Sequence, residues 1–208
     1  MASLTEDYVV RQVAESTETK QRLLADKRLL SEIFTVGNLL IDTYRAGNKT
    51  LLAGNGGSAA DAQHICAEFV SRFYFDRPAL PSLALTTDSS ILTAIGNDYG
   101  YEKLFQRQLQ ANGKPGDVFI AISTSGNSPN ILAALEVCKE LGITAIGLAG
   151  ETGGKMAALC DHCLKMPSKS TPRIQECHIL IGHILCSMVE EALFADVRER
   201  AERRSKLA

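Results

Sequence analysis

Short apolar runs alternate with longer segments of helical periodicity along most of this chain of 208 residues. The apolar runs cover residues 50–56, 81–88, 117–128, 143–150 and 162–168. Two of them contain VFIAI and TAIGL, which are apolar throughout, as strands covered on both faces must be. This alternation predicts an α/β three-layer sandwich, in which a five-stranded parallel sheet lies between helices.

The segments around these runs predict the helices. We expect helices over residues 58–73, 129–142, 153–160 and 171–194, and two helical pieces within 89–112 separated by Gly96-Asn97-Asp98. Pro129 suits a first helical position and Gly142 suits the end of the same helix. Residues 5–46 keep helical spacing without a proline and predict a long N-terminal helix. The expected organisation is a helical segment (1–46), a single domain (47–197) and a charged tail (198–208) that frays.

Composition excludes several classes of protein. A formal charge of −2 and a pI near 6.1 argue against a broad nucleic-acid footprint. The apolar stretches are interrupted well before the ~20 residues that a membrane span needs. The N-terminus, MASLTEDYVVRQ, lacks the basic-then-apolar order of a signal peptide. We therefore expect a cytoplasmic protein with no membrane and no nucleic-acid partner.

The chain has six cysteines. Cys66, Cys138, Cys177 and Cys186 lie in apolar helical patterns, where a free cysteine acts as a small hydrophobe. The remaining two form the CDHC stretch, residues 160–163. A CxxC pair can be redox-active or half of a zinc site, but no second CxxC completes four sulfur ligands. The less specific interpretation, a pair without a special role, is favoured.

Three loops are expected at the carboxyl ends of strands, where parallel sheets bind ligands. These are GNGGS (54–58), TTDSS (86–90) and STSGNS (123–128). In GNGGS, glycines permit close backbone approach, and Asn55 and Ser58 add hydrogen-bonding side chains. The sequence is neither a Walker loop nor GxGxxG, so a ligand loop and a plain turn both remain open.

The STSGNS loop is the more informative one. Ser123, Thr124, Ser125 and Ser128 bring hydroxyls to the start of a predicted helix, and Asn127 adds an amide. Hydroxyls together with helix-end N–H groups can hold a phosphate monoester without Lys or Arg. A helix cap would need one such residue, so the surplus favours a phosphate site.

Two helices carry candidate metal ligands. His64 and Glu68 are four residues apart and share a helix face, either as a metal half-site or as a surface pair. The last helix places Gln175, Glu176, His178 and His183 in an apolar stretch, where each His could also be a hydrogen-bonded core residue. Gln175 and His183 are separated by a rise of about 12 Å, so one shared metal needs side chains that converge or come from two subunits.

Four segments together resemble a known family. GNGGSAADAQH, AIGNDYGYEKLF, GDVFIAISTSGNSPNI and PRIQECHILIGHI, in this order, are similar to the sugar isomerase (SIS) superfamily, and specifically to bacterial phosphoheptose isomerases. The resemblance runs from about residue 5 to 194. It implies a flavodoxin-like doubly wound fold assembled as a homotetramer, with active sites at subunit interfaces.

The resemblance also implies the chemistry. It implies one Zn²⁺ per subunit held by His64, Glu68, Gln175 and His183, and a phosphate site at Ser123, Thr124, Ser125 and Ser128. The sugar would be lined by Asn55, Gly56, Gly57, Ser58, Asn97 and Asp98, with Glu68 and Gln175 also touching the substrate. Sedoheptulose 7-phosphate would become D-glycero-D-manno-heptose 7-phosphate through an enediol, as the first step of ADP-heptose biosynthesis for lipopolysaccharide or other surface sugars. Glu68 is the expected base and His183 the expected acid.

One position departs from the family pattern. Some relatives carry an acidic residue just before the Arg of RIQE, where this chain has Pro172. An acid at that position therefore has no part in this chain's mechanism, and Asp61 or Asp98 is an alternative for orienting groups.

Two other functions compete with the isomerase. A non-enzymatic SIS tetramer that assists the replication initiator shares most of the motifs but lacks the acid and the imidazole found here at Glu68 and His183. A phosphosugar-sensing regulatory domain would normally accompany a DNA-binding domain, and residues 1–46 show no basic helix-turn-helix pattern.

Overall fold

The computed structural model describes residues 5–205 of the chain. Its sheet has five parallel strands in the order β2-β1-β3-β4-β5. The strands are β1 (Thr50–Gly54), β2 (Ser82–Ala84), β3 (Val118–Ser123), β4 (Thr144–Ala149) and β5 (His162–Lys165). The parallel five-stranded prediction is confirmed, and this strand order is the flavodoxin-like doubly wound one.

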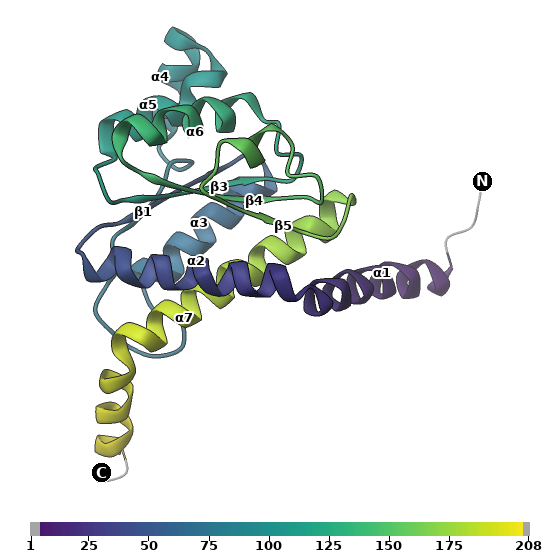
Figure 1. The fold of residues 1–208 in the computed structure, drawn as a ribbon, viewed down its shortest axis with the longest axis vertical. Coiled ribbons are helices and arrows are strands. Elements are labelled where there is room, and N and C mark those ends of the chain that lie inside the picture. Colours follow the sequence, from purple (N-terminus) through teal and green to yellow (C-terminus); the bar gives the residue numbers. More distant parts are fainter. Residues whose placement is uncertain (1–4, 206–208) are drawn as a thin grey trace.

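Helices cover both faces of the sheet (Figure 1). One face carries α2 (Lys27–Arg45), α3 (Gly57–Val70) and α7 (Thr171–Ser205). The other carries α5 (Leu104–Asn112) and α6 (Pro129–Leu141). Neighbouring strand residues serve opposite layers: Leu52 lies in the core under α2, α3 and α7, whereas Leu51 lies in the core under α5 and α6. The three-layer sandwich is thus built by strands that are apolar on both faces.

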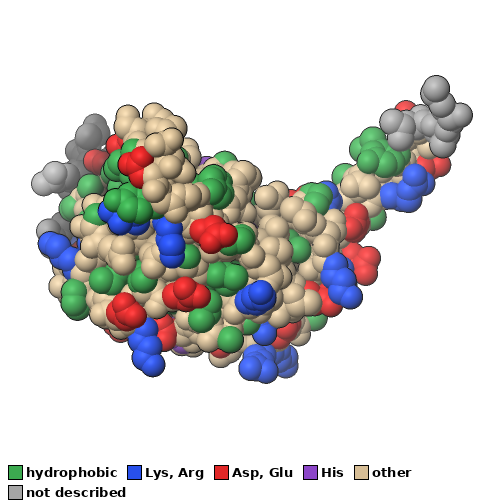
Figure 2. All heavy atoms as spheres, turned by 90° about the horizontal axis from the view of Figure 1, so that it is seen from above, with side chains coloured by type: hydrophobic (Ala, Val, Ile, Leu, Met, Phe, Trp, Pro, Cys, Tyr) green, Lys and Arg blue, Asp and Glu red, His purple; other side chains and the backbone are tan. Residues whose placement is uncertain are grey.

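The N-terminal prediction of one long helix is wrong in detail. The segment forms α1 (Glu6–Ala25) and α2, which are separated at Asp26. Asp26 has φ −82° and ψ 88°, and its side chain accepts a hydrogen bond from the Leu29 N–H at 3.0 Å. The carboxylate therefore caps the start of α2 and interrupts a run that apolar spacing alone makes continuous. Beyond this break, α1 projects from the body (Figures 1 and 2).

Two other boundaries differ from the predictions. Gly96-Asn97-Asp98 does not split the 89–112 segment, since α4 (Ser89–Tyr99) runs through it and stops before Gly100, whose φ is 87°. A short 3-10 helix, η1 (Tyr101–Lys103), then leads into α5. The short helix expected at 153–160 is also a 3-10 turn, η2 (Lys155–Ala158). The helix from Pro129 agrees with prediction, with Gly142 in the left-handed region after it.

The last helix is the core helix of one layer. It continues to Ser205 across a break at Phe194, where φ is −134°. On the sequence alone, we expect every apolar stretch to be too short to span a membrane. By length and composition, however, the segment Thr171–Glu199 of this helix is long and apolar enough to do so. Ile181, Leu185 and Val189 are nevertheless buried against the sheet layer, as a core helix requires. The division into residues 1–46, 47–197 and 198–208 stays a prediction.

A buried ion pair fastens α7 to the end of α3. Arg77 Nε lies 3.1 Å from Glu190 Oε1, and both side chains are 1% exposed. Arg77 also donates to the Glu68 and Phe69 carbonyl oxygens at 2.7 and 2.6 Å. Glu190 in turn accepts from the N–H groups of Phe73 and Tyr74. All polar atoms of the pair thus have partners, which such a buried pair needs.

Replacing Glu190 with Ala should lower the free energy of unfolding by about 3–5 kcal/mol, because the Arg77 charge stays buried without its partner. The neighbouring Glu191 pairs with Arg198 at half-exposed positions, so Glu191→Ala should cost about 1 kcal/mol or less. Urea unfolding at one fixed protein concentration measures both. Equal losses for the two variants would contradict the role assigned to Glu190.

Candidate active site

The loops after β1 and β3 meet at the point where the strand order reverses. Asn55, after β1, and Asn130, in the first turn of α6, donate to each other's side-chain oxygens at 2.9 and 2.8 Å. The Tyr101 hydroxyl donates to Asn55 Oδ1 at 3.0 Å. Because β1 and β3 are neighbours whose following helices lie on opposite faces, a crevice for ligands is expected here. The amide pair closes the two loops against each other.

Two hydroxyls of the STSGNS loop lie together at the start of α6, and the predicted phosphate site stays a prediction. Ser123 Oγ and Ser128 Oγ are 3.0 Å apart. Ser128 occupies the N-cap position of α6 but makes no capping hydrogen bond with its side chain. The capping interpretation therefore does not account for Ser128, whose hydroxyl is directed to Ser123. Gly126, with φ 65°, passes so close to Gly153 that a Cβ would lie 2.1 Å from the Gly153 carbonyl oxygen.

Three of the four predicted metal ligands converge within one chain. The donor atoms of His64, Glu68 and His183 all lie within 4.8 Å of one another. His64 Nε2 is 2.9 Å from His183 Nε2 and 3.3 Å from Glu68 Oε1. Two imidazoles and a carboxylate are a common zinc donor set. The convergence follows from helix register: α3 and α7 run side by side, so residues 64 and 68 of one face residue 183 of the other.

Gln175 lies at the other end of this helix pair. Its amide nitrogen is 2.6 Å from where a Cβ of Gly57 would be. The absence of a side chain at Gly57 leaves the space that the Gln175 amide occupies. Gln175 thus borders the GNGGS loop, and its place among the metal ligands stays a prediction.

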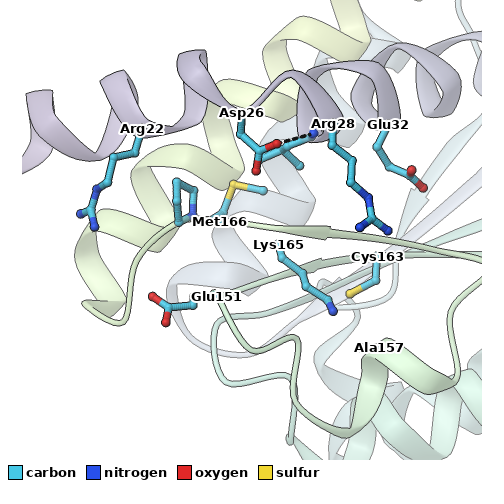
Figure 3. Close-up of a pocket in the computed structure, with 11 residues that line it drawn as sticks. Arg22, Asp26, Arg28, Glu32, Glu151, Ala157, Cys163, Lys165 and Met166 are labelled. Atoms are coloured by element: carbon cyan, nitrogen blue, oxygen red, sulfur yellow. Dashed lines mark hydrogen bonds between the residues drawn. The ribbon is translucent and has the colours of Figure 1, made fainter.

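The remaining predicted residues have mixed positions. Gly56 and Asn55 line a cavity of about 330 Å³ together with Thr86, Thr93 and Tyr101. Asn97 and Asp98 are exposed near the end of α4, where the Asn97 amide donates to Asp98 at 2.8 Å. No interaction described for this part of the chain joins them to the loops. Their role in binding the sugar is therefore untested. A larger cavity lies elsewhere, between the α1–α2 junction and β5 (Figure 3).

Asp61 lies one turn before His64 on α3. Its Oδ2 atom is buried and has no hydrogen-bond partner among the described residues. Burial raises the pKa of Asp61, and the nearby His64 opposes that rise. Ser58 is buried close by in the first turn of α3. A buried polar atom without a partner, beside the cluster of His64, Glu68 and His183, is compatible with the predicted orienting role.

His178 is a core residue. It is fully buried, and its Nε2 lies 3.2 Å from the Ala149 carbonyl oxygen at the end of β4. Burial lowers the pKa of His178 to about 4, with the Ala149 contact opposing the shift. The sequence-based alternative of a hydrogen-bonded core histidine is therefore the one that the structure supports.

Sequence reasoning missed three residues of this region. Asn130 and Tyr101 hold Asn55, and Arg77 binds the carbonyl of Glu68. An amide directly after the SxxGNSP pattern is a signal that could have indicated Asn130. Arg77 and Glu190 are far apart in sequence and carry no motif, so only the fold reveals their pairing.

Comparison with known proteins agrees with this geometry. The chain matches the SIS domain family over residues 13–150. The phosphoheptose isomerase of Aneurinibacillus thermoaerophilus is 69% identical over 188 residues, which cover 90% of this chain and 95% of that protein. The phosphoheptose isomerase structure from Francisella tularensis has a TM-score of 0.87 and 34% identity, over 91% of this chain and 100% of that one. The structure from Neisseria gonorrhoeae has a TM-score of 0.83 and 42% identity, over 89% and 98%.

The chain therefore belongs to the phosphoheptose isomerase family of SIS-domain proteins. The likeness extends over about nine-tenths of the chain and nearly all of each relative, so it includes α3 and α7 as well as the loops. The non-enzymatic alternative, a tetramer that binds the replication initiator, is not favoured by these relatives.

Stability should fall as pH drops from 6.5 toward 4, because the unfolded chain then binds a proton at His178 that the folded chain excludes. The contribution is complete above pH 6.5 and is lost through this window, with a slope of up to about 1.4 kcal/mol per pH unit. Urea unfolding across the range should show a flatter pH dependence for His178→Gln than for wild type. Parallel profiles would contradict the assignment.

Proposed function

We propose that this chain is an aldose–ketose isomerase that converts sedoheptulose 7-phosphate to D-glycero-D-manno-heptose 7-phosphate. The observation that carries the proposal is the convergence of His64, Glu68 and His183, whose donor atoms lie within 4.8 Å of one another. The same fold brings the hydroxyls of Ser123 and Ser128 together in the STSGNS loop. The named relatives, up to 69% identical, support the substrate.

The phosphate end of the sugar would bind at the STSGNS loop. Ser123, Ser125 and Ser128 would donate hydroxyl hydrogen bonds, with Thr124 beside them, and the N-terminus of α6 would add its dipole. The chain of the sugar would then extend along the GNGGS loop, past Asn55, Gly56, Gly57 and Ser58. Binding by hydroxyls and N–H groups suits a dianionic monoester, because each oxygen accepts several hydrogen bonds.

The reaction requires a proton to move between C1 and C2. We assign Glu68 as the base that removes this proton and His183 as the acid that protonates the oxygen on the opposite side. Both side chains are partly exposed to solvent, so a substrate can reach them. Glu68 is held by its contact with His64 at 3.3 Å and by the Arg77 bond to its own carbonyl oxygen.

The residues present fit one Zn²⁺ per subunit. His64, Glu68 and His183 would hold it, with Gln175 as the proposed fourth ligand. When bound, zinc would supply Lewis-acid polarisation of the sugar's carbonyl or hydroxyl oxygens. A carboxylate that also binds a cation is a weaker base, so Glu68 would need to be loosely bound to act in both roles.

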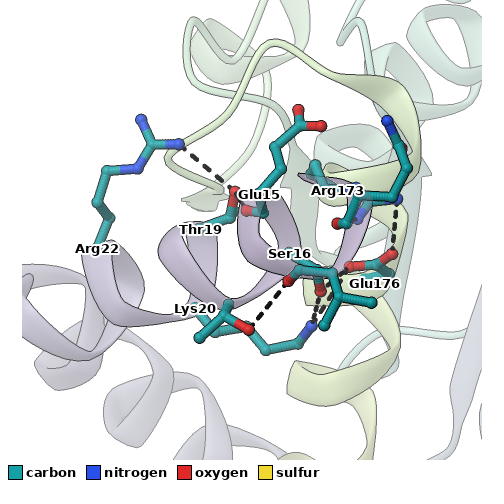
Figure 4. Close-up of polar contacts among 10 residues, drawn as sticks. Glu15, Ser16, Thr19, Lys20, Arg22, Arg173 and Glu176 are labelled. Carbon is teal, nitrogen blue, oxygen red and sulfur yellow. Dashed lines mark hydrogen bonds and ion pairs between the residues drawn. The ribbon is translucent and has the colours of Figure 1, made fainter. Parts of the chain in front are cut away.

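The projecting helix supports an oligomer. Polar contacts hold α1 to the start of α7 (Figure 4). Ser16 Oγ donates to Glu176 Oε2 at 2.6 Å, and Lys20 Nζ donates to both of these oxygens. Farther out, the helix exposes Tyr8, Val9, Val10 and Val13 (Figure 2 shows apolar side chains on this arm). An arm with exposed valines is best explained by burial against other subunits. We propose a homotetramer in the cytoplasm that supplies heptose for ADP-heptose and surface polysaccharide.

Replacing Glu68 with Gln should lower the turnover number for sedoheptulose 7-phosphate by at least about 10²-fold, since the amide cannot accept the proton. The fold should be unchanged by circular dichroism. Glu140→Gln, on the exposed side of α6, is the matched control and should keep wild-type turnover. A Glu68→Gln enzyme with a near-normal rate would remove Glu68 as the base.

His64→Ala should weaken zinc binding by at least about tenfold, because even residues that only support a metal ligand contribute this much. Wild type and the control His162→Ala should each retain one zinc per subunit by elemental analysis after equilibrium dialysis. Chelation should abolish turnover of wild type, and added zinc should restore it. Full turnover in the zinc-free protein would contradict a catalytic metal.

A further inference from the structure

Cys160 and Cys163 differ from the other cysteines of the chain. Cys160 follows η2 and Cys163 lies in β5, and both are partly exposed, whereas Cys66, Cys138, Cys177 and Cys186 are buried. The sulfur atoms of both residues lie beside Gly147 of β4. The CDHC stretch is therefore a paired dithiol at the edge strand of the sheet.

The neighbouring strand makes room for both sulfur atoms. Gly147 of β4 pairs with Cys163 of β5. A Cβ on Gly147 would lie 2.8 Å from Cys160 Sγ and 3.4 Å from Cys163 Sγ. Any side chain at this position would enter the space that the sulfurs share, so the glycine is what allows the pair to form.

Cys163 also reaches solvent. It lines the cavity of about 540 Å³ between the α1–α2 junction and β5, together with Arg28 and Lys165 (Figure 3). Residues 163 and 165 are two apart in a strand and share one face, and Figure 3 shows the Lys165 amine beside the Cys163 sulfur. The cavity is large enough to admit a small molecule to the sulfur.

The carboxylates that line the same cavity have other partners. Asp26 accepts from the Leu29 N–H, Glu32 lies 2.9 Å from His162 Nδ1, and Glu151 lies 3.6 Å from Lys169 Nζ. The lining thus has three basic side chains, Arg22, Arg28 and Lys165, and three acidic ones, and the basic group beside the Cys163 sulfur is Lys165. Lys165 can therefore attract a negatively charged group of a reactant that approaches this sulfur.

The two thiols have different acidities. The Cys160 side chain and the charge of Lys165 lower the pKa of Cys163, although burial and Glu32 oppose the shift. The Cys163 side chain and burial raise the pKa of Cys160. Since the thiolate is the nucleophile, Cys163 is the attacking residue and Cys160 the second thiol of the pair.

We propose that Cys163 and Cys160 form a thiol–disulfide exchange site for small anionic disulfides, with Cys163 attacking and Cys160 resolving. The Cys163 thiolate attacks one sulfur of R–S–S–R, whose S–S bond breaks, and the departing RS⁻ takes a proton from solvent. Cys160 then loses its proton and attacks Cys163 Sγ, which forms the Cys160–Cys163 disulfide and releases the second thiol RSH. The dithiol is oxidised by two electrons and R–S–S–R is reduced to two thiols.

The test treats the reduced full-length protein with oxidised glutathione, followed by acid quenching, intact mass and peptide mapping. We expect a transient glutathionyl adduct on Cys163 that is replaced by a Cys160–Cys163 disulfide. Cys160→Ser should stop at the adduct, and Cys163→Ser should react at least about tenfold more slowly. Cys138→Ala, which removes a buried thiol, should react like wild type.

Lys165→Gln provides a second variant that leaves both thiols in place. It should slow formation of the adduct, and added salt should slow the wild-type reaction toward the same rate. An adduct that maps to another cysteine, a Cys163→Ser protein that reacts at the wild-type rate, or a wild-type adduct that never resolves would each overturn the proposal. If Cys163→Ser does not fold, an unchanged rate for Lys165→Gln together with an adduct outside residues 160–163 would overturn it.

Discussion

The buried ion pair between Arg77 and Glu190 sets the relation between α3 and α7, and the candidate active site depends on that relation. Arg77 donates to two carbonyl oxygens in the last turn of α3, those of Glu68 and Phe69, while Glu190 belongs to α7. A carboxylate on one helix and an imidazole on the other can bind the same metal ion or substrate only if the two helices keep a fixed register. The ion pair provides a directional constraint that apolar packing of α3 on α7 would not provide alone.

The sheet makes the second contribution. Its parallel strands deliver the GNGGS and STSGNS loops to one edge, and the reversal of strand order between β1 and β3 opens the space between them. Glycines at these turns allow close approach, as the contact between Gly126 and the Gly153 carbonyl shows. The amide pair Asn55–Asn130 then fixes the distance between the loops. A phosphate site built on hydroxyls needs such a rigid frame, because each hydrogen bond is weak compared with an ion pair.

Local patterns in the sequence were sufficient for the sheet and most of its helices. Strand cores such as VFIAI are apolar throughout because both faces are covered, and this is visible without coordinates. The break at Asp26 was missed because helical spacing continues on both sides of it, and one capping carboxylate decides the boundary. The Gly96-Asn97-Asp98 break was wrong because helix propensity is a weak prior and α4 tolerates a single glycine.

The site was predictable only where its residues are close together in the sequence. His64 and Glu68 share a face of one helix, so their proximity follows from spacing. Their meeting with His183 required the register of α7, which no local pattern contains. Gln175 and His183 are separated along α7 by a rise of about 12 Å, and they accordingly have separate neighbours in α3. Gln175 faces Gly57, whereas His183 faces His64.

The helices α3 and α7 run in the same direction, with Gly57 beside Gln175 and His64 beside His183. This arrangement gives a reason why two helices are used for one small substrate. Residues 57 and 64 of α3 are separated by a rise of about 10 Å, and residues 175 and 183 of α7 follow the same direction. One end of the helix pair therefore lies at the loop that follows β1, and the other end carries the imidazoles and the carboxylate. A sugar anchored by its phosphate at the loops would place its far carbons toward Glu68. The distance along the helices would then select for the length of the sugar, since a shorter chain anchored at the same loops would not bring C1 and C2 to Glu68, the proposed base.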